Sequence, residues 1–165
     1  MRTTRFPPLA LALVLAAACS TAEGAPRLEN AFSDPEAVAR AALDALWVGD
    51  WEALESFLVT REEHETLLWD ALPESKHLTF GDARALNVRN TRKALNNAFR
   101  DYRSDGYELL GIEFTKSTEV YEEFTLHRGA RLRLRRQSDG SEGYLIFLDV
   151  LLEYHGQWKP MNYKE

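Results

Sequence analysis

Residues 144–163 read YLIFLDVLLEYHGQWKPMNY, and this stretch decides the fold class. Tyr144 to Glu153 is an almost continuous apolar run, which is typical of a strand in the middle of a sheet. His155-Gly156 is a plausible two-residue turn, and Gln157 to Tyr163 is again rich in apolar and aromatic side chains. The stretch therefore predicts two antiparallel strands joined by a tight hairpin.

More strands are expected upstream of this hairpin. The segments concerned are Glu108 to Thr115, Glu119 to Arg128 and Ala130 to Arg136. In the last of these, leucines alternate with arginines, which indicates one buried and one solvated face. Asp139-Gly140 is a strong hairpin signal just after it. The second half of the chain is therefore predicted to be an antiparallel meander.

The first half has helical periodicity instead. The expected helices are one from Asp34-Pro35 to Gly49, a short one capped by Asp50, one from the Thr60–Glu63 capping box to about Trp69, and one from about Thr91 to Arg103 capped by Asn90. Residues 74–89 have no clear pattern. Helices followed by an antiparallel sheet predict an α+β fold.

The N-terminus predicts export. Arg2 and Arg5 precede an uncharged, mostly apolar run, Phe6 to Ala18, which is shorter than the roughly 20 residues of a spanning helix. Small residues then lead into Cys19, the one cysteine of the chain. Cleavage before or near Cys19 divides the chain into a signal peptide (1–18), a tether (19–32) and a single domain (33–165).

This N-terminus resembles the lipobox of bacterial lipoproteins, although Ala16 stands where that motif prefers leucine. The resemblance implies acylation of Cys19, cleavage at its amino side and a membrane anchor. Ser20 rather than aspartate after the cysteine suggests the outer membrane, with the domain facing the periplasm. Ordinary signal-peptidase cleavage after Ala18 is the alternative, and it would leave a lone thiol in an oxidising compartment.

The overall charge argues against nucleic-acid binding. The formal charge is −6, and it becomes −8 without residues 1–18, which hold two of the 20 basic and none of the 26 acidic residues. A surface this acidic repels phosphate backbones.

The segment ALDALWVGDWEAL, residues 42–54, resembles the opening of the nuclear transport factor two and SnoaL-like superfamily. The resemblance implies a cone-like domain, with N-terminal helices packed on a curved antiparallel sheet and a pocket between them. Some members of that superfamily are enzymes that use Asp, His or Tyr inside the cone, and many only bind.

Two strand residues are the candidates for acid–base chemistry, Asp149 and His127. A buried Asp149 without an arginine partner would have a raised pKa, as a general base needs. The competing interpretation pairs Asp149 with an arginine of the 130–136 strand. His64 lies in a charged run and is expected to be solvated. No metal site, cofactor site or phosphate loop is expected.

Five aromatic residues are candidates for an apolar ligand pocket, although aromatic residues at helical spacing more often belong to the core. They are Trp47, Trp51, Trp69, Phe114 and Phe147. The sequence thus predicts an envelope lipoprotein that binds a small apolar ligand or a protein partner without catalysis. The alternatives are a small SnoaL-type hydro-lyase or isomerase and an acidic inhibitor-type partner of a basic protein. The oligomeric state is left open.

Overall fold

The computed structural model describes residues 26–102 and 106–164. The expected signal peptide, Cys19 and the first part of the tether lie outside these residues. The fold is α+β, as the sequence predicted. The helical elements are α1 (Pro35–Val48), α2 (Trp51–Phe57), α3 (Arg61–Glu63), the π-helical turn η1 (His64–Leu68), the 3₁₀ turns η2 (Trp69–Ala71) and η3 (Pro73–Lys76), and α4 (Phe80–Tyr102).

Seven described strands form two antiparallel sheets. The strands are β1 (Tyr107–Phe114), β2 (Thr118–Val120), β3 (Phe124–Arg128), β4 (Ala130–Arg136), β5 (Glu142–Leu145), β6 (Leu148–Tyr154) and β7 (Gln157–Tyr163). One sheet has the order β1-β4-β5, and the other has the order β2-β3-β6-β7. The predicted turn at His155-Gly156 joins β6 to β7, and both of its residues have positive φ angles, 47° and 75°.

The chain bends at Gly129, where it passes from one sheet to the other. This glycine separates β3 from β4, has φ +69°, and donates a backbone hydrogen bond to the carbonyl of Asp149 at 2.7 Å. A Cβ atom at this position would come within 2.6 Å of Oγ1 of Thr115. The bend therefore favours glycine, since a side chain would be strained at this backbone angle and would have to displace Thr115.

The prediction of one central strand over residues 144–153 was wrong. The apolar run instead forms β5 in one sheet and β6 in the other, with Ile146 and Phe147 crossing between them. Phe147 is buried and Ile146 is exposed. The predicted strand 119–128 is also divided, because Tyr121 begins a turn and its N–H donates to the carbonyl of Phe124.

The start of α1 follows the predicted capping. The Asp34 side chain accepts a hydrogen bond from the Ala37 N–H at 2.7 Å, Pro35 occupies the first helical position, and Gly49 ends the helix with φ 80°. Asp50 caps α2 in the same way, through the Ala53 N–H at 2.9 Å.

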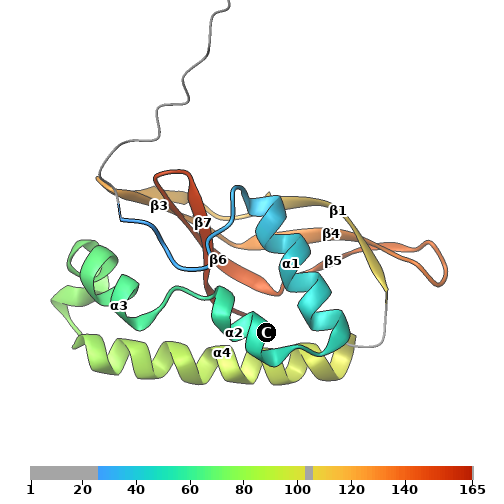
Figure 1. The fold of residues 1–165 in the computed structure, drawn as a ribbon, viewed down its shortest axis with the longest axis horizontal. Coiled ribbons are helices and arrows are strands. Elements are labelled where there is room, and N and C mark those ends of the chain that lie inside the picture. The colour runs from blue at the N-terminus through green and yellow to red at the C-terminus, as the bar shows by residue number, and fades with distance from the viewer. Residues whose placement is uncertain (1–25, 103–105, 165) are drawn as a thin grey trace, which may run out of the picture.

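The start of α4 was predicted wrongly. The helix begins at Phe80 rather than at Thr91, and Asn90 lies inside it rather than at its cap. Thr79 supplies the N-terminal cap, since its Oγ1 accepts a hydrogen bond from the Asp82 N–H at 3.2 Å. The sequence lacks a clear apolar period here, because Asn87 and Thr91 are polar although they face the protein in the first half of the helix. Figure 1 shows α4 along one side of the molecule, with α3 beside its N-terminal end.

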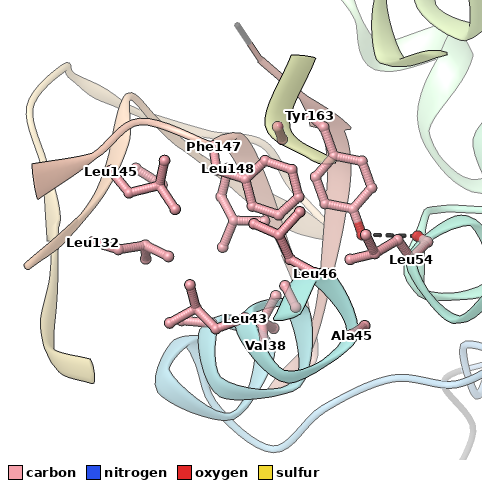
Figure 2. Packing of buried hydrophobic residues seen from close by; sticks show 14 of the residues in the cluster. Val38, Leu43, Ala45, Leu46, Leu54, Leu132, Leu145, Phe147, Leu148 and Tyr163 are labelled. Atoms are coloured by element: carbon pink, nitrogen blue, oxygen red, sulfur yellow. Dashed lines mark hydrogen bonds between the residues drawn. The ribbon is translucent and has the colours of Figure 1, made fainter. Parts of the chain in front are cut away.

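Two apolar clusters hold the elements together. In the larger one, side chains of α1 face β4, β6 and β7, and Figure 2 shows Leu46 of α1 with Phe147 and Tyr163. The hydroxyl of Tyr163 donates to the carbonyl of Leu54 at 2.8 Å, which ties β7 to α2. The smaller cluster lies under the α3–η3 segment, and its residues are Leu28, Val59, Leu68, Leu72, Phe124, Leu126, Val150, Leu152, Tyr154 and Met161.

Candidate functional site

The α3–η1 segment brings two polar side chains into the protein interior. Thr60 and Glu63 form the predicted capping box, with the Glu63 carboxylate accepting from the Thr60 N–H at 2.8 Å. The helix then widens to a π-helical turn that starts at His64. Such turns occur frequently at functional sites because they displace side chains from regular helical positions. Glu63 and His64 are both buried.

Glu63 has a structural partner. Its carboxylate accepts a hydrogen bond from Nζ of Lys159 at 2.8 Å, and the Lys159 side chain is fully buried. The Glu29 N–H donates to the same carboxylate at 2.7 Å. Burial alone raises the pKa of Glu63, but the hydrogen bonds from Lys159 and from the Thr60 and Glu29 amides outweigh it, so this pKa is lowered. Glu63 is therefore a charged anchor that joins α3 to β7.

His64 has no such partner. The residue is 5% exposed, and neither ring nitrogen has a hydrogen-bond partner among the described residues. Its ring packs edge-on against Phe80, at 5.3 Å between ring centroids, and against Trp69 at 6.1 Å. Burial, together with the nearby Arg84 charge, lowers the pKa of His64 to about 4. The expectation of a solvated His64 was thus wrong, and the imidazole is neutral at pH 7.

His64 lines a pocket of about 140 Å³ between the α3–η3 segment, α4 and the four-stranded sheet. The residues around it are His64, Trp69, Leu72, Glu74, Ala83, Asn87, Leu126, Arg128, Val150, Met161 and Asn162. We call it the His64 pocket. An apolar wall with a few convergent polar groups is the usual character of a small-molecule site.

Three other polar side chains of the His64 pocket are already engaged. Arg128 donates through Nε and Nη2 to the carboxylate of Glu119, at 2.6 and 2.9 Å. The Asn87 amide donates to the Met161 carbonyl at 3.3 Å. Asn162 accepts from a β6 backbone N–H at 3.2 Å. His64 is thus the buried side chain of this pocket whose hydrogen-bonding capacity is unused in the described structure.

The two strand candidates lie elsewhere. Asp149 has a side chain 21% exposed, and its carboxylate is 3.7 Å from Nζ of Lys164. The acid–base hypothesis required a buried, unpaired carboxylate, and this arrangement does not supply one. The predicted arginine pairing is wrong as well, because β5 rather than β6 lies next to β4 in the sheet.

His127 faces away from the His64 pocket, since Leu126 lines that pocket and consecutive strand residues point to opposite faces. Its Nε2 is 2.9 Å from the Glu153 carboxylate. Its ring lies near the rings of Phe114 and Trp158, at centroid distances of 5.0 and 4.7 Å. His127 is thus part of a packed cross-strand pair.

The five predicted pocket aromatics are not brought together. Trp69 lines the His64 pocket, whereas Trp47 lies near the C-terminal end of α1, 45% exposed. The other three belong to or pack against the larger cluster and make ring contacts there: Trp51 with Phe99, Phe114 with His127, and Phe147 with Tyr163.

Within residues 26–102 and 106–164, no group of three or more His, Cys, Asp or Glu side chains is arranged to hold a metal ion. No helix in the same residues has the length and hydropathy needed to cross a membrane.

His64 was not predicted as a site residue, because the charged residues around it in the sequence indicated a solvated side chain. A different signal was present, since His64 is four residues before Leu68, and residues at this spacing share one face of a helix. Leu68 is part of the smaller cluster.

Comparison with protein-family models, with curated proteins and with solved structures finds no match to this chain.

Proposed function

We propose that this chain is a lipid-anchored protein of the bacterial envelope whose domain binds a small, mainly apolar molecule and does no chemistry on it. One observation carries the binding proposal. The His64 pocket has an apolar wall and contains a buried imidazole whose two nitrogens have no hydrogen-bond partner in residues 26–102 and 106–164. Buried polar groups without partners are uncommon in native proteins, and a site awaiting a ligand is one physical reason for them.

Binding is better supported than catalysis. A histidine with a pKa near 4 is a weak base at neutral pH, and a catalytic histidine is normally oriented by a second group. The His127–Glu153 pair has such a partner, but it lies on the other face of the four-stranded sheet, among packed rings.

The proposed anchor rests on the lipobox-like sequence at Cys19, and the start of the described residues limits how far the domain can lie from it. The Gln157 side chain accepts from the Leu28 N–H at 2.9 Å and donates to the Pro26 carbonyl at 3.2 Å, so the start of the domain is fastened beside the β6–β7 turn. From Cys19 to Pro26, an extended chain reaches about 25 Å. We propose that this short reach holds the domain close to the outer membrane on its periplasmic side.

The anchor can be tested by intact mass and membrane fractionation of the exported protein, with Cys19→Ser as the comparison. The proposal expects mature protein that begins at Cys19, carries the mass of acyl chains and sediments with membranes. The Cys19→Ser variant should lose this added mass. Mature protein without acyl chains, recovered in the soluble fraction, would contradict the anchor.

Binding can be tested by a thermal-shift and NMR screen of single-ring compounds. Ala83 lines the His64 pocket, so Ala83→Leu should fill part of it and abolish the shifts. Ala85 lies exposed on the same helix, and Ala85→Leu is the matched control that should leave them intact. If no compound binds the parent protein, or if both variants behave alike, the His64 pocket is not a binding site.

A further inference from the structure

We infer that the ligand of the His64 pocket is an uncharged single-ring molecule with one hydroxyl group, and that this hydroxyl hydrogen-bonds the His64 imidazole. The inference rests on the binding function proposed above and assigns the chemical class of the ligand.

The size of the pocket suits about one ring. A cavity of about 150 Å³ lined by apolar side chains is known to hold benzene. The His64 pocket, at about 140 Å³, is close to this value. Trp69, Leu126 and Val150 provide apolar surface for such a ring.

The polar atoms of the pocket determine what the ring must carry. A neutral imidazole has one nitrogen that donates a hydrogen bond and one that accepts, and His64 uses neither in the described structure. A hydroxyl group can both donate and accept, so it matches His64 in either tautomer. A purely apolar ring would leave these nitrogens desolvated and unpartnered, which weakens binding.

The charges around the pocket favour a neutral ligand. The guanidinium of Arg128 is paired with Glu119 through two hydrogen bonds. Glu74 lines the pocket with its own negative charge. Arg84 influences His64 electrostatically, but it lines a separate, larger pocket bounded by α2, α4 and β7. A carboxylate in the His64 pocket would therefore face Glu74, and Arg128, the cation that lines the pocket, is already paired.

Three single-ring probes separate these features: phenol and toluene, which are nearly equal in size, and benzoate, which carries a carboxylate. Their affinities for the full domain are measured by NMR titration at pH 7. Phenol should bind about 3- to 10-fold more tightly than toluene, the ratio expected of one neutral hydrogen bond. Benzoate should bind more weakly than both.

The His64→Leu variant should bind phenol no better than toluene, and His77→Leu, which removes an exposed histidine, should preserve the preference. His64→Leu should fold, because it removes a buried polar group that has no partner. If it does not fold, the imidazole resonances of His64 in the parent give the same information: phenol should shift them more than toluene.

The possible outcomes distinguish a failure of the proposed ligand class from a failure of the proposed binding function. Toluene binding as tightly as phenol would overturn the hydroxyl assignment and leave the binding function intact. Tighter binding of benzoate would show that the Arg84 charge dominates, and it would overturn the assignment of a neutral ligand. Failure of all three probes in the parent protein would count against both the inference and the His64 pocket as a ligand site.

Discussion

Replacement of Lys159 by methionine tests whether the buried ion pair fastens the α3 segment to the sheet. Lys159 has no exposed surface, and its ammonium group is 2.8 Å from the Glu63 carboxylate, which is itself 9% exposed. Removing one partner of a buried pair costs about 3–5 kcal/mol, because the other charge remains buried. The Thr60 and Glu29 amides still donate to Glu63, so we expect the lower end, about 3 kcal/mol.

The assay is urea unfolding of the domain, supported by thermal melting. In a domain of this size, such a loss should lower Tm by roughly 10 °C. The matched control is Arg40→Met, which removes an exposed pair with Glu36 and should change the free energy of unfolding by less than about 0.5 kcal/mol. The double variant Lys159→Met with Glu63→Leu should be less destabilised than the sum of its single changes, since neither charge remains unpaired.

The pH dependence gives an independent check. The folded pKa of Glu63 is below its ordinary value of 4.5, so its contribution to stability is present above pH 4.5 and is lost as the pH falls through the folded pKa. The stability difference between the parent and Lys159→Met should therefore be largest at neutral pH and should narrow in acid. A difference under about 1 kcal/mol at pH 7 would refute the reasoning, and so would one that widens in acid.

Three further predictions concern other positions. Gly129→Ala should lower the free energy of unfolding by about 1–3 kcal/mol, because residue 129 has a positive φ angle and the new Cβ atom would approach Thr115. An unchanged urea midpoint would mean that the bend tolerates a side chain. Tyr163→Phe should cost about 1–2 kcal/mol by the same assay, because the buried Leu54 carbonyl loses its donor. His64 takes up a proton below about pH 6.5 in the unfolded chain but only near pH 4 in the folded protein. The free energy of unfolding should therefore fall by up to about 1.4 kcal/mol per pH unit as the pH is lowered from 6.5 to 4. Parallel pH profiles of the parent and His64→Leu would contradict this.

Much of the local structure could be predicted because its causes are local. The cap at Asp34, the glycine that ends α1 and the Thr60–Glu63 capping box each depend on residues within one turn of helix. The hairpin at His155-Gly156 depends on two residues that adopt positive φ angles. Such signals act over a few residues, so they can be read from the chain without knowledge of what packs against it.

The candidate site could not be predicted in the same way. His64 is buried because a π-helical turn, α4 and strand residues such as Val150 meet around it, and these segments lie far apart in the sequence. Three charged neighbours of His64 in the sequence, Arg61, Glu62 and Glu65, are exposed, and they dominated the prediction. The start of α4 was missed for a related reason, because Asn87 and Thr91 face the protein but are polar.

The sequence by itself determined the α+β class, most of the element boundaries and the expectation of a lipid anchor at Cys19. These follow from hydrophobic period, capping and turn residues, which are properties of short segments. The tertiary structure decided that residues 144–153 divide between two sheets at the Gly129 bend. It also decided that His64 lies unpartnered in a pocket, because burial and hydrogen-bond partners depend on contacts between distant segments.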